Sequence, residues 1–227
     1  MDGPRSETLF DPAPSFEGLP EAGFEMFALP DRVARRKAIV QTIHPGLRLL
    51  AEELVRLLDP DATTPLHSHI PRLDWPRDYE PFCTWATLSP ATHGYLAGPQ
   101  LNLGVHADHV SVRLGWDATA DAFGRFEFLC RHSDLGRELI ELADGQDLVF
   151  RVYSSAPWPE GSRCVFESRE NLSGSLNELR RHGIWWELGR RFDLPGSLPL
   201  VTTTALRDEA LRLFRLLLPV YGRILGH

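Results

Sequence analysis

The densest group of side chains that could recognise a ligand lies in residues 101–114. Polar and apolar residues alternate there on both sides of Ala107 and Asp108, a pattern typical of a β-hairpin with a two-residue turn. Because neighbouring side chains of a strand point to opposite faces, the polar residues of both strands would share one face. Imidazole and guanidinium groups on such a face suit an anionic ligand, since both donate hydrogen bonds to carboxylate or phosphate. The predicted polar face carries Asn102, His106, His109, Ser111 and Arg113.

Two aromatic residues outside the hairpin complete the predicted ligand-binding site. We expect Trp85 and Tyr95 to border the polar face, and Gly104 to leave room for a ligand close to the backbone. The opposite, apolar face of the hairpin, which includes Val112, is expected to pack in the core. The alternative is a polar face that is solvated and binds nothing, because antiparallel sheets commonly leave one face in water.

Four histidines support a second interpretation, a metal-dependent hydrolase. His67 and His69 are separated by one residue, so in a strand both side chains would point the same way. With His106 and His109 they would supply the imidazole ligands that zinc accepts. The same His-x-His pattern also suits a polar loop. We therefore expect no bound metal and no cofactor.

Arginine pairs on either side of a tryptophan pair support a third interpretation, single-stranded nucleic-acid binding. Arg180-Arg181 and Arg190-Arg191 flank Trp185-Trp186, and arginine with aromatic side chains commonly holds single strands. Alternation in a strand would bury one tryptophan side chain and expose the other. The net charge of −7 argues against nucleic acid as a partner.

The sequence lacks the motifs of several enzyme classes, so it leaves open whether the protein is an enzyme. G-x-S-x-G, H-E-x-x-H, G-x-G-x-x-G and the P-loop are all absent. Cys83, Cys130 and Cys164 are far apart and form no C-x-x-C, which disfavours a zinc ribbon or a disulfide framework and favours a cytoplasmic location. No apolar run approaches the length of about 18 residues that a membrane span needs.

The elements that would position these residues indicate an α+β fold in a single compact domain over residues 23–227. Residues 1–22 are rich in proline and predict a flexible tail. Asp31 would cap a helix over 31–43, and Pro45 would begin a second helix over 45–58. Gly145 is the expected cap after residue 143. Further helices are expected at 119–131, 134–143, 175–181 and 204–224, and further strands at 82–88, 147–153, 163–168 and 184–188.

Several short sequence motifs occur in a characteristic order between residues 24 and 224. The motifs are Ile43–Leu47, Thr84-Trp85, Gly94-Tyr95, Pro99, Leu103-Gly104, Asp108–Val110 and Leu217–Tyr221. This order resembles the YktB-like family of uncharacterised bacterial proteins. The resemblance implies one α+β domain whose antiparallel sheet is packed by N-terminal and C-terminal helices, and it implies no activity. The chain departs from the family by its longer tail and by His106 and Arg113, where relatives carry large aromatic residues.

The most direct expectation for function is a non-catalytic module that binds a small ligand or a partner on the polar face of the hairpin. A small anionic ligand is the partner that these side chains favour. The oligomeric state is not indicated by any feature of the sequence.

Overall fold

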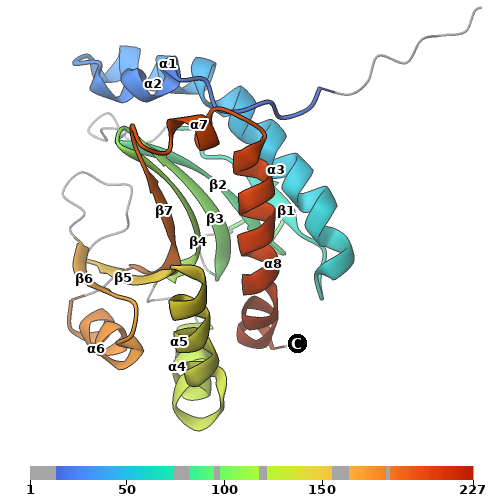
Figure 1. Ribbon diagram of the computed structural model, residues 1–227, viewed down its shortest axis with the longest axis vertical. Coiled ribbons are helices and arrows are strands. Elements are labelled where there is room, and N and C mark those ends of the chain that lie inside the picture. The colour runs from blue at the N-terminus through green and yellow to red at the C-terminus, as the bar shows by residue number, and fades with distance from the viewer. Residues whose placement is uncertain are drawn as a thin grey trace, which may run out of the picture.

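The strands of the protein form one antiparallel sheet, and the sheet carries the polar hairpin at its centre. A computed structural model describes residues 14–73, 82–94, 98–117, 122–154, 164–182 and 185–226. The seven strands lie in the order β1-β2-β3-β4-β7-β5-β6 (Figure 1). They are β1 (His67–His69), β2 (Cys83–Ser89), β3 (Gln100–His106), β4 (His109–Asp117), β5 (Val149–Tyr153), β6 (Cys164–Ser168) and β7 (Trp185–Asp193).

The longer helices pack against one face of this sheet and bury a continuous apolar core with it. Figure 1 shows α3 and α8 side by side near the end of the sheet that holds β1 and β2. Helices α4, α5 and α6 lie near the opposite end, which holds β5 and β6. The predicted α+β class is confirmed. The helices are α1 (Ala22–Glu25), η1 (Met26–Ala28), α2 (Arg32–Thr42), α3 (His44–Leu58), η2 (Asp59–Asp61), α4 (Ala122–His132), α5 (Leu135–Gln146), α6 (Leu172–His182), α7 (Leu198–Val201) and α8 (Ala205–Leu225). None of the helices in these ranges has the length and apolarity needed to cross a bilayer.

The two predicted helices near the N-terminus are confirmed, and their observed ends lie within one residue of the predicted ones. The Asp31 carboxylate accepts a hydrogen bond of 2.7 Å from the backbone N–H of Ala34, which caps α2. Pro45 lies in the first turn of α3, where its missing N–H has no helical partner to lose. The apolar side of α3, which includes Leu47 and Leu54, is fully buried.

The hairpin of β3 and β4 has the predicted register. Leu103 pairs with Val112, and Asn102 pairs with Arg113. Val112 is fully buried on the helix side of the sheet, as expected for the apolar face. The polar residues of both strands therefore share the opposite face.

Two helix boundaries differ from the sequence-based predictions. Helix α6 begins at Leu172 and not at Ser175, because Asn171 accepts a hydrogen bond of 2.7 Å from the N–H of Gly174 and serves as the cap. The Ser175 hydroxyl instead donates to the backbone oxygen of Leu172. Helix α5 continues through Gly145, and Asp147 ends it with a left-handed backbone φ of 56°.

Residues 14–22, expected to belong to the flexible tail, are packed against the domain. Phe16 and Leu19 are 1% and 2% exposed. The N–H of Phe16 donates to the Glu53 carboxylate at 2.7 Å, and the N–H of Leu19 donates to the backbone oxygen of Val201 at 3.0 Å. The predicted boundary at residue 22 is therefore wrong for this stretch, since long-range contacts offset its unfavourable composition. Residues 1–13 lie outside the described ranges.

His44 connects the first long helix to the sheet and makes the stability of the fold sensitive to pH. Its Nε2 lies 2.8 Å from the Thr84 hydroxyl on β2. Burial, with a smaller effect of Arg48, lowers the pKa of His44 from 6.5 to about 4. The native state therefore holds a neutral imidazole at a pH where the unfolded chain already binds a proton.

We expect the contribution of His44 to be complete above about pH 6.5 and to fall as the pH drops from 6.5 towards 4. By pH 5 the loss in the free energy of unfolding should reach about 2 kcal/mol. Urea unfolding at pH 7.5 and pH 5 would measure this loss in the wild type and in His44→Gln, whose amide can still bond to Thr84. An equal loss in both proteins would show that His44 does not carry this pH dependence.

Candidate functional site

The sheet face turned away from the helices holds charged and polar side chains that are nevertheless buried. Arg113 and Glu187 are 3% and 1% exposed. Since an unpaired charge is costly to bury, each of them needs partners on this face. We call this group the polar cluster. It comprises Thr87, Asn102, Arg113, Arg151, Tyr153, Trp185 and Glu187.

Glu187 on β7 is the centre of the polar cluster. Its carboxylate lies 2.9 Å from Nη1 of Arg113, which makes a buried ion pair. It also accepts hydrogen bonds of 3.2 Å from the Tyr153 hydroxyl and from the Trp185 indole N–H. Nη1 of Arg151 lies 3.9 Å away. The charge of Glu187 is thus balanced by donors from β4, β5 and β7.

Arg113 is held on its other side by a chain of side-chain hydrogen bonds. Its Nε donates to the Asn102 oxygen at 3.1 Å, and the Asn102 amide donates to the Thr87 hydroxyl at 3.1 Å. The Thr87 hydroxyl in turn donates to the Gln100 side-chain oxygen at 3.0 Å. Arg113 is therefore an internal member of a network that spans β2, β3, β4 and β7.

This arrangement corrects the expectation that Arg113 and its neighbours point into solvent. The residues do share one face, as the alternation predicted, but β7 and β5 lie beside β4 and supply partners for them. Arg113 pairs with Gly189 of β7, and Gly189 pairs with Val149 of β5. The hairpin therefore lies in the middle of the sheet and not at its edge, and its polar side chains have neighbours on both sides.

Two glycines let the Arg113 side chain lie flat on the sheet. A Cβ atom on Gly189 would overlap the Arg113 Cβ and come within 2.5 Å of the Val112 backbone oxygen. A Cβ atom on Gly104 would come within 2.5 Å of the Ser111 hydroxyl and 3.0 Å of Nη2 of Arg113. Gly104 therefore makes room for Arg113 and not, as expected from the sequence, for a ligand.

We expect Gly189→Ala to lower the free energy of unfolding by about 1–3 kcal/mol, because the overlapped atoms belong to backbone and to a Cβ and cannot rotate away. Chemical denaturation would measure the change. Gly145→Ala is the matched control, since a Cβ there meets no atom within 4 Å and alanine favours the helix that contains it. If both variants were as stable as the wild type, the close packing at Gly189 would be refuted.

Two histidine rings close the turn end of the polar face. The rings of His106 and His109 are stacked, with centroids 4.0 Å apart and planes 11° from parallel. Nδ1 of His109 lies 2.6 Å from the Asp108 carboxylate. A carboxylate accepts hydrogen bonds, so Nδ1 carries the hydrogen and Nε2 of His109 is left as an acceptor.

Both rings are neutral at physiological pH. Burial, with smaller contributions from the positive charges of Arg191, Arg113 and Arg151, lowers the pKa of His109 from 6.5 to about 2. Burial also lowers the pKa of His106 well below 6.5. These pKa values are low mainly because the rings are buried, and the nearby guanidinium groups make a smaller contribution in the same direction.

Three polar atoms at this end are buried and have no hydrogen-bond partner among the residues that the structure describes. They are the Ser111 hydroxyl, Nε of Arg191 and Nε2 of His106. Ser111 and Arg191 are directly paired across β4 and β7, and Ser111 is 2% exposed. Buried polar groups are almost always hydrogen-bonded, so this end of the face is suited to a ligand that supplies the missing partners.

A cavity of about 350 Å³ lies on the same face, beside this end. Arg191 and Asp193 line it from β7, and Arg151 and Glu167 line it from β5 and β6. Nε of Arg151 donates to Glu167 at 2.8 Å, while Arg191 contacts Asp193 at 3.1 Å. The described lining contains four arginines and three carboxylates, so guanidinium groups are in slight excess.

Comparison with known proteins finds a family similar to the N-terminal part of the chain. Residues 20–122 match DUF1054, a domain of unknown function. The DUF1054 match agrees with the resemblance to the YktB-like family and confirms it. It runs from the N-terminal helices through β4 and so includes the hairpin, whereas β7 and β5 lie beyond it. No curated protein matches the chain.

The predicted site residues fall into three groups. Asn102 and Arg113 are internal members of the polar cluster, whereas His106, His109 and Ser111 lie together at the turn end. Trp85 is buried in a small apolar group with Cys83, Trp185 and Tyr153. Tyr95 lies outside the described residues.

Sequence reasoning did not identify Glu187 and Arg151 as site residues, and it considered Arg191 only for nucleic-acid binding. Glu187 lies between the apolar residues Trp186 and Leu188 on β7, as the polar residues of β4 lie between apolar ones. This alternation is a usable signal. The alternation alone could not assign these residues to the site, because the sequence does not show that β7 pairs with β4.

The structure does not bring together the four histidines of the metal interpretation. His67 pairs with Ser89 at one end of β2, whereas His106 pairs with Cys83 at the other end. Nε2 of His69 is bonded to the backbone oxygen of Ala91 at 2.7 Å. Among the described residues, no group of three or more His, Cys, Asp and Glu side chains is arranged to hold a metal ion.

The tryptophan pair of the nucleic-acid interpretation is also buried. Trp185 and Trp186 are both fully buried, on opposite faces of β7. The expectation that one of them is exposed is wrong, because the sheet is covered on both faces at this point. Arg190 and Arg191 are engaged with Glu209 and Asp193, respectively. Neither indole is available for stacking with a base.

Proposed function

We propose that the protein is a binding module for a small anionic ligand, which sits at the turn end of the polar sheet face. The observation that carries this proposal is the cross-strand pair of Ser111 and Arg191. Both residues place a buried polar atom there that has no partner within the described part of the chain. An acceptor-bearing ligand would complete both groups at once.

The charge of the site supports an anion over a cation. Arg191, Arg113 and Arg151 all act on His109 strongly enough to depress its pKa. A positive field of this kind repels metal ions and ammonium groups and attracts carboxylates and phosphates. The cavity of about 350 Å³ beside it is large enough for a small metabolite.

The anchor for the ligand differs from the one expected from the sequence. Arg113 is saturated by Glu187 and Asn102 and is buried. Arg191 is 31% exposed and lines the cavity, so it can reach a ligand. We therefore assign the anchoring role to Arg191, with Ser111 as a second donor.

A binding role without catalysis fits the chemistry of the nearest thiol. Cys83 pairs with His106 across β2 and β3, and a cysteine beside a histidine is one arrangement that activates a nucleophile. Burial raises the pKa of the Cys83 thiol to about 12. The thiol is therefore protonated at neutral pH, whereas a cysteine nucleophile needs a thiolate.

A thermal-shift screen of carboxylate and phosphate metabolites, with titration calorimetry of each hit, tests the proposal. Any hit should bind wild-type protein and bind at least tenfold more weakly to Arg191→Gln and to Ser111→Ala. Arg137→Gln is the control, because Arg137 lies on the exposed side of α5 and contacts only Asp134 and Glu141 in the described structure. Hits that bind all four proteins equally, or the absence of any hit, would refute the proposed site.

A further inference from the structure

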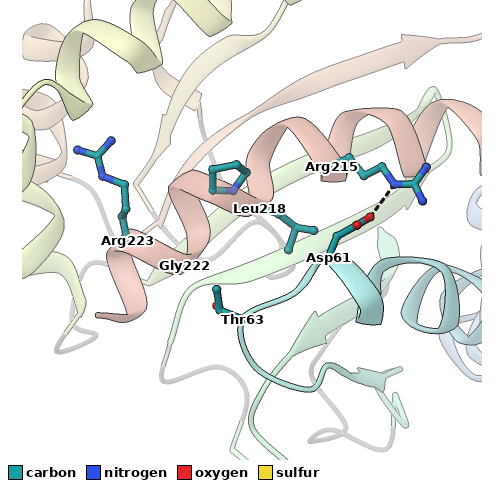
Figure 2. Close-up of a pocket in the computed structure, with 7 residues that line it drawn as sticks. Asp61, Thr63, Arg215, Leu218, Gly222 and Arg223 are labelled. Atoms are coloured by element: carbon teal, nitrogen blue, oxygen red, sulfur yellow. Dashed lines mark hydrogen bonds and ion pairs between the residues drawn. The ribbon is translucent and has the colours of Figure 1, made fainter. Parts of the chain in front are cut away.

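A second cavity lies along α8, far from the polar face of the sheet, and it has a different character. Its volume is about 600 Å³, within the usual range of small-molecule sites. Five of its lining residues recur at intervals of three to four positions along one side of the helix: Arg215, then Leu218 and Pro219, then Gly222 and Arg223. Figure 2 shows Asp61 and Thr63, on the connection after α3, facing Arg215 and Leu218 across the cavity.

The sequence of α8 is unfavourable for a helix at this cavity and nowhere else. Pro219 and Gly222 are the two residues in α8 that disfavour helical structure, and both line the cavity. A proline inside a helix costs about 3 kcal/mol and a glycine about 1 kcal/mol relative to alanine. Such a sequence is expected where the surface of the helix has a role other than stability.

Each of these two residues shapes the cavity. Proline has no N–H, so the backbone oxygen of Arg215, four residues earlier, loses its helical donor, and the proline ring adds apolar surface. A Cβ atom on Gly222 would lie 3.3 Å from the Thr63 hydroxyl, so glycine keeps the floor of the cavity open. Leu218, which is 8% exposed, adds an apolar side chain between them.

Arg215 presents its charge at one end of the cavity, whereas the Arg223 side chain at the other end points away from it and pairs with Glu138 (Figure 2). Arg215 and Arg223 are eight positions apart, which corresponds to about 12 Å along the helix. Nε of Arg215 donates to Asp61 at 3.0 Å, and Nη2 of Arg215 donates to the Leu57 backbone oxygen at 3.3 Å. These bonds fix the guanidinium, and its Nη1 has no partner among the described residues.

We propose that this cavity binds a medium-length amphipathic carboxylate. The carboxylate head would accept hydrogen bonds from Nη1 of Arg215, while the hydrocarbon chain would cover Leu218, Pro219 and Gly222. Arg215 is the group that supports this choice, because its Nη1 has no partner among the described residues, whereas the Arg223 guanidinium is already paired with Glu138 at 2.6 Å. An arginine at one end of an apolar floor matches a ligand with one anionic end.

Titration of ¹⁵N-labelled full-length protein with octanoate, followed by NMR, tests the proposal. We expect saturable shifts of the Leu218, Gly222 and Thr63 amide signals, with octylamine and acetate producing no saturable shift. Arg215→Gln should weaken octanoate binding at least tenfold by removing the anchor. Thr63→Phe, at an exposed wall position, should do the same by filling the cavity.

Arg212→Gln is the matched control, because Arg212 is an exposed arginine of the same helix that contacts Glu209 and Gln146 outside the cavity. It should bind octanoate like the wild type. Equal binding of octanoate and octylamine, equal binding by all variants, or no saturable shift would overturn the proposal. Since the probe and the variants differ from those for the polar face, failure of one proposal leaves the other testable.

Discussion

Arg113→Ala is expected to lower the free energy of unfolding by about 3–5 kcal/mol, which is the usual cost of removing one partner from a buried ion pair. The substitution leaves the Glu187 carboxylate, 1% exposed, without its closest cation. It also removes the hydrogen bond that orients Asn102. For a domain of this size the melting temperature should fall by roughly 6–20 °C.

Two further variants separate the charge of Arg113 from its packing. Arg113→Lys retains the positive charge but loses the paired geometry that reaches Glu187 and Asn102 together, so its loss should be smaller than that of Arg113→Ala. Glu187→Gln combined with Arg113→Met removes both charges and should recover part of the stability lost by Arg113→Ala. Arg137→Ala on the surface should leave the unfolding midpoint unchanged. A wild-type midpoint for Arg113→Ala would show that the polar cluster does not stabilise the fold.

Removal of residues 1–20 is expected to destabilise the protein by at least about 4 kcal/mol, because it takes two buried apolar side chains out of the core. Phe16 and Leu19 are 1% and 2% exposed. The same deletion removes the N–H donors that reach Glu53 and Val201. Differential scanning calorimetry of the truncated and full-length proteins would measure the loss.

Deletion of residues 1–13 alone is the matched control, since it retains Phe16 and Leu19 with all their contacts. Phe16→Ala in the full-length chain should by itself cost about 3–5 kcal/mol. Melting temperatures that are the same for both truncated proteins would show that residues 14–20 contribute nothing to the stability of the fold.

Local features of the fold could be predicted from the sequence because a short segment contains their cause. Alternation on both sides of Ala107-Asp108 fixes the register of β3 and β4, and the Asp31 side chain fixes the start of α2. Each of these signals acts between residues that are close in the chain.

The environment of the hairpin could not be predicted, because it depends on residues that are distant in the chain. Glu187 and Arg151 reach Arg113 only through the order in which the strands pair, and that order leaves no mark on residues 101–114. The burial of Phe16 has the same origin, since its partner Glu53 lies on α3. The amino-acid composition of a segment therefore does not show which distant residues pack against it.

The position of β7 has a consequence for how the chain folds. This strand lies between β4 and β5 although it is the last strand in the sequence. Contacts between residues so far apart raise the contact order and slow folding. During synthesis, one edge of β4 stays unpaired until residue 193 has left the ribosome. An unpaired strand edge can form hydrogen bonds with other chains, which leads to aggregation. A fragment limited to residues 20–122 would keep that edge open permanently, so it should aggregate instead of folding by itself.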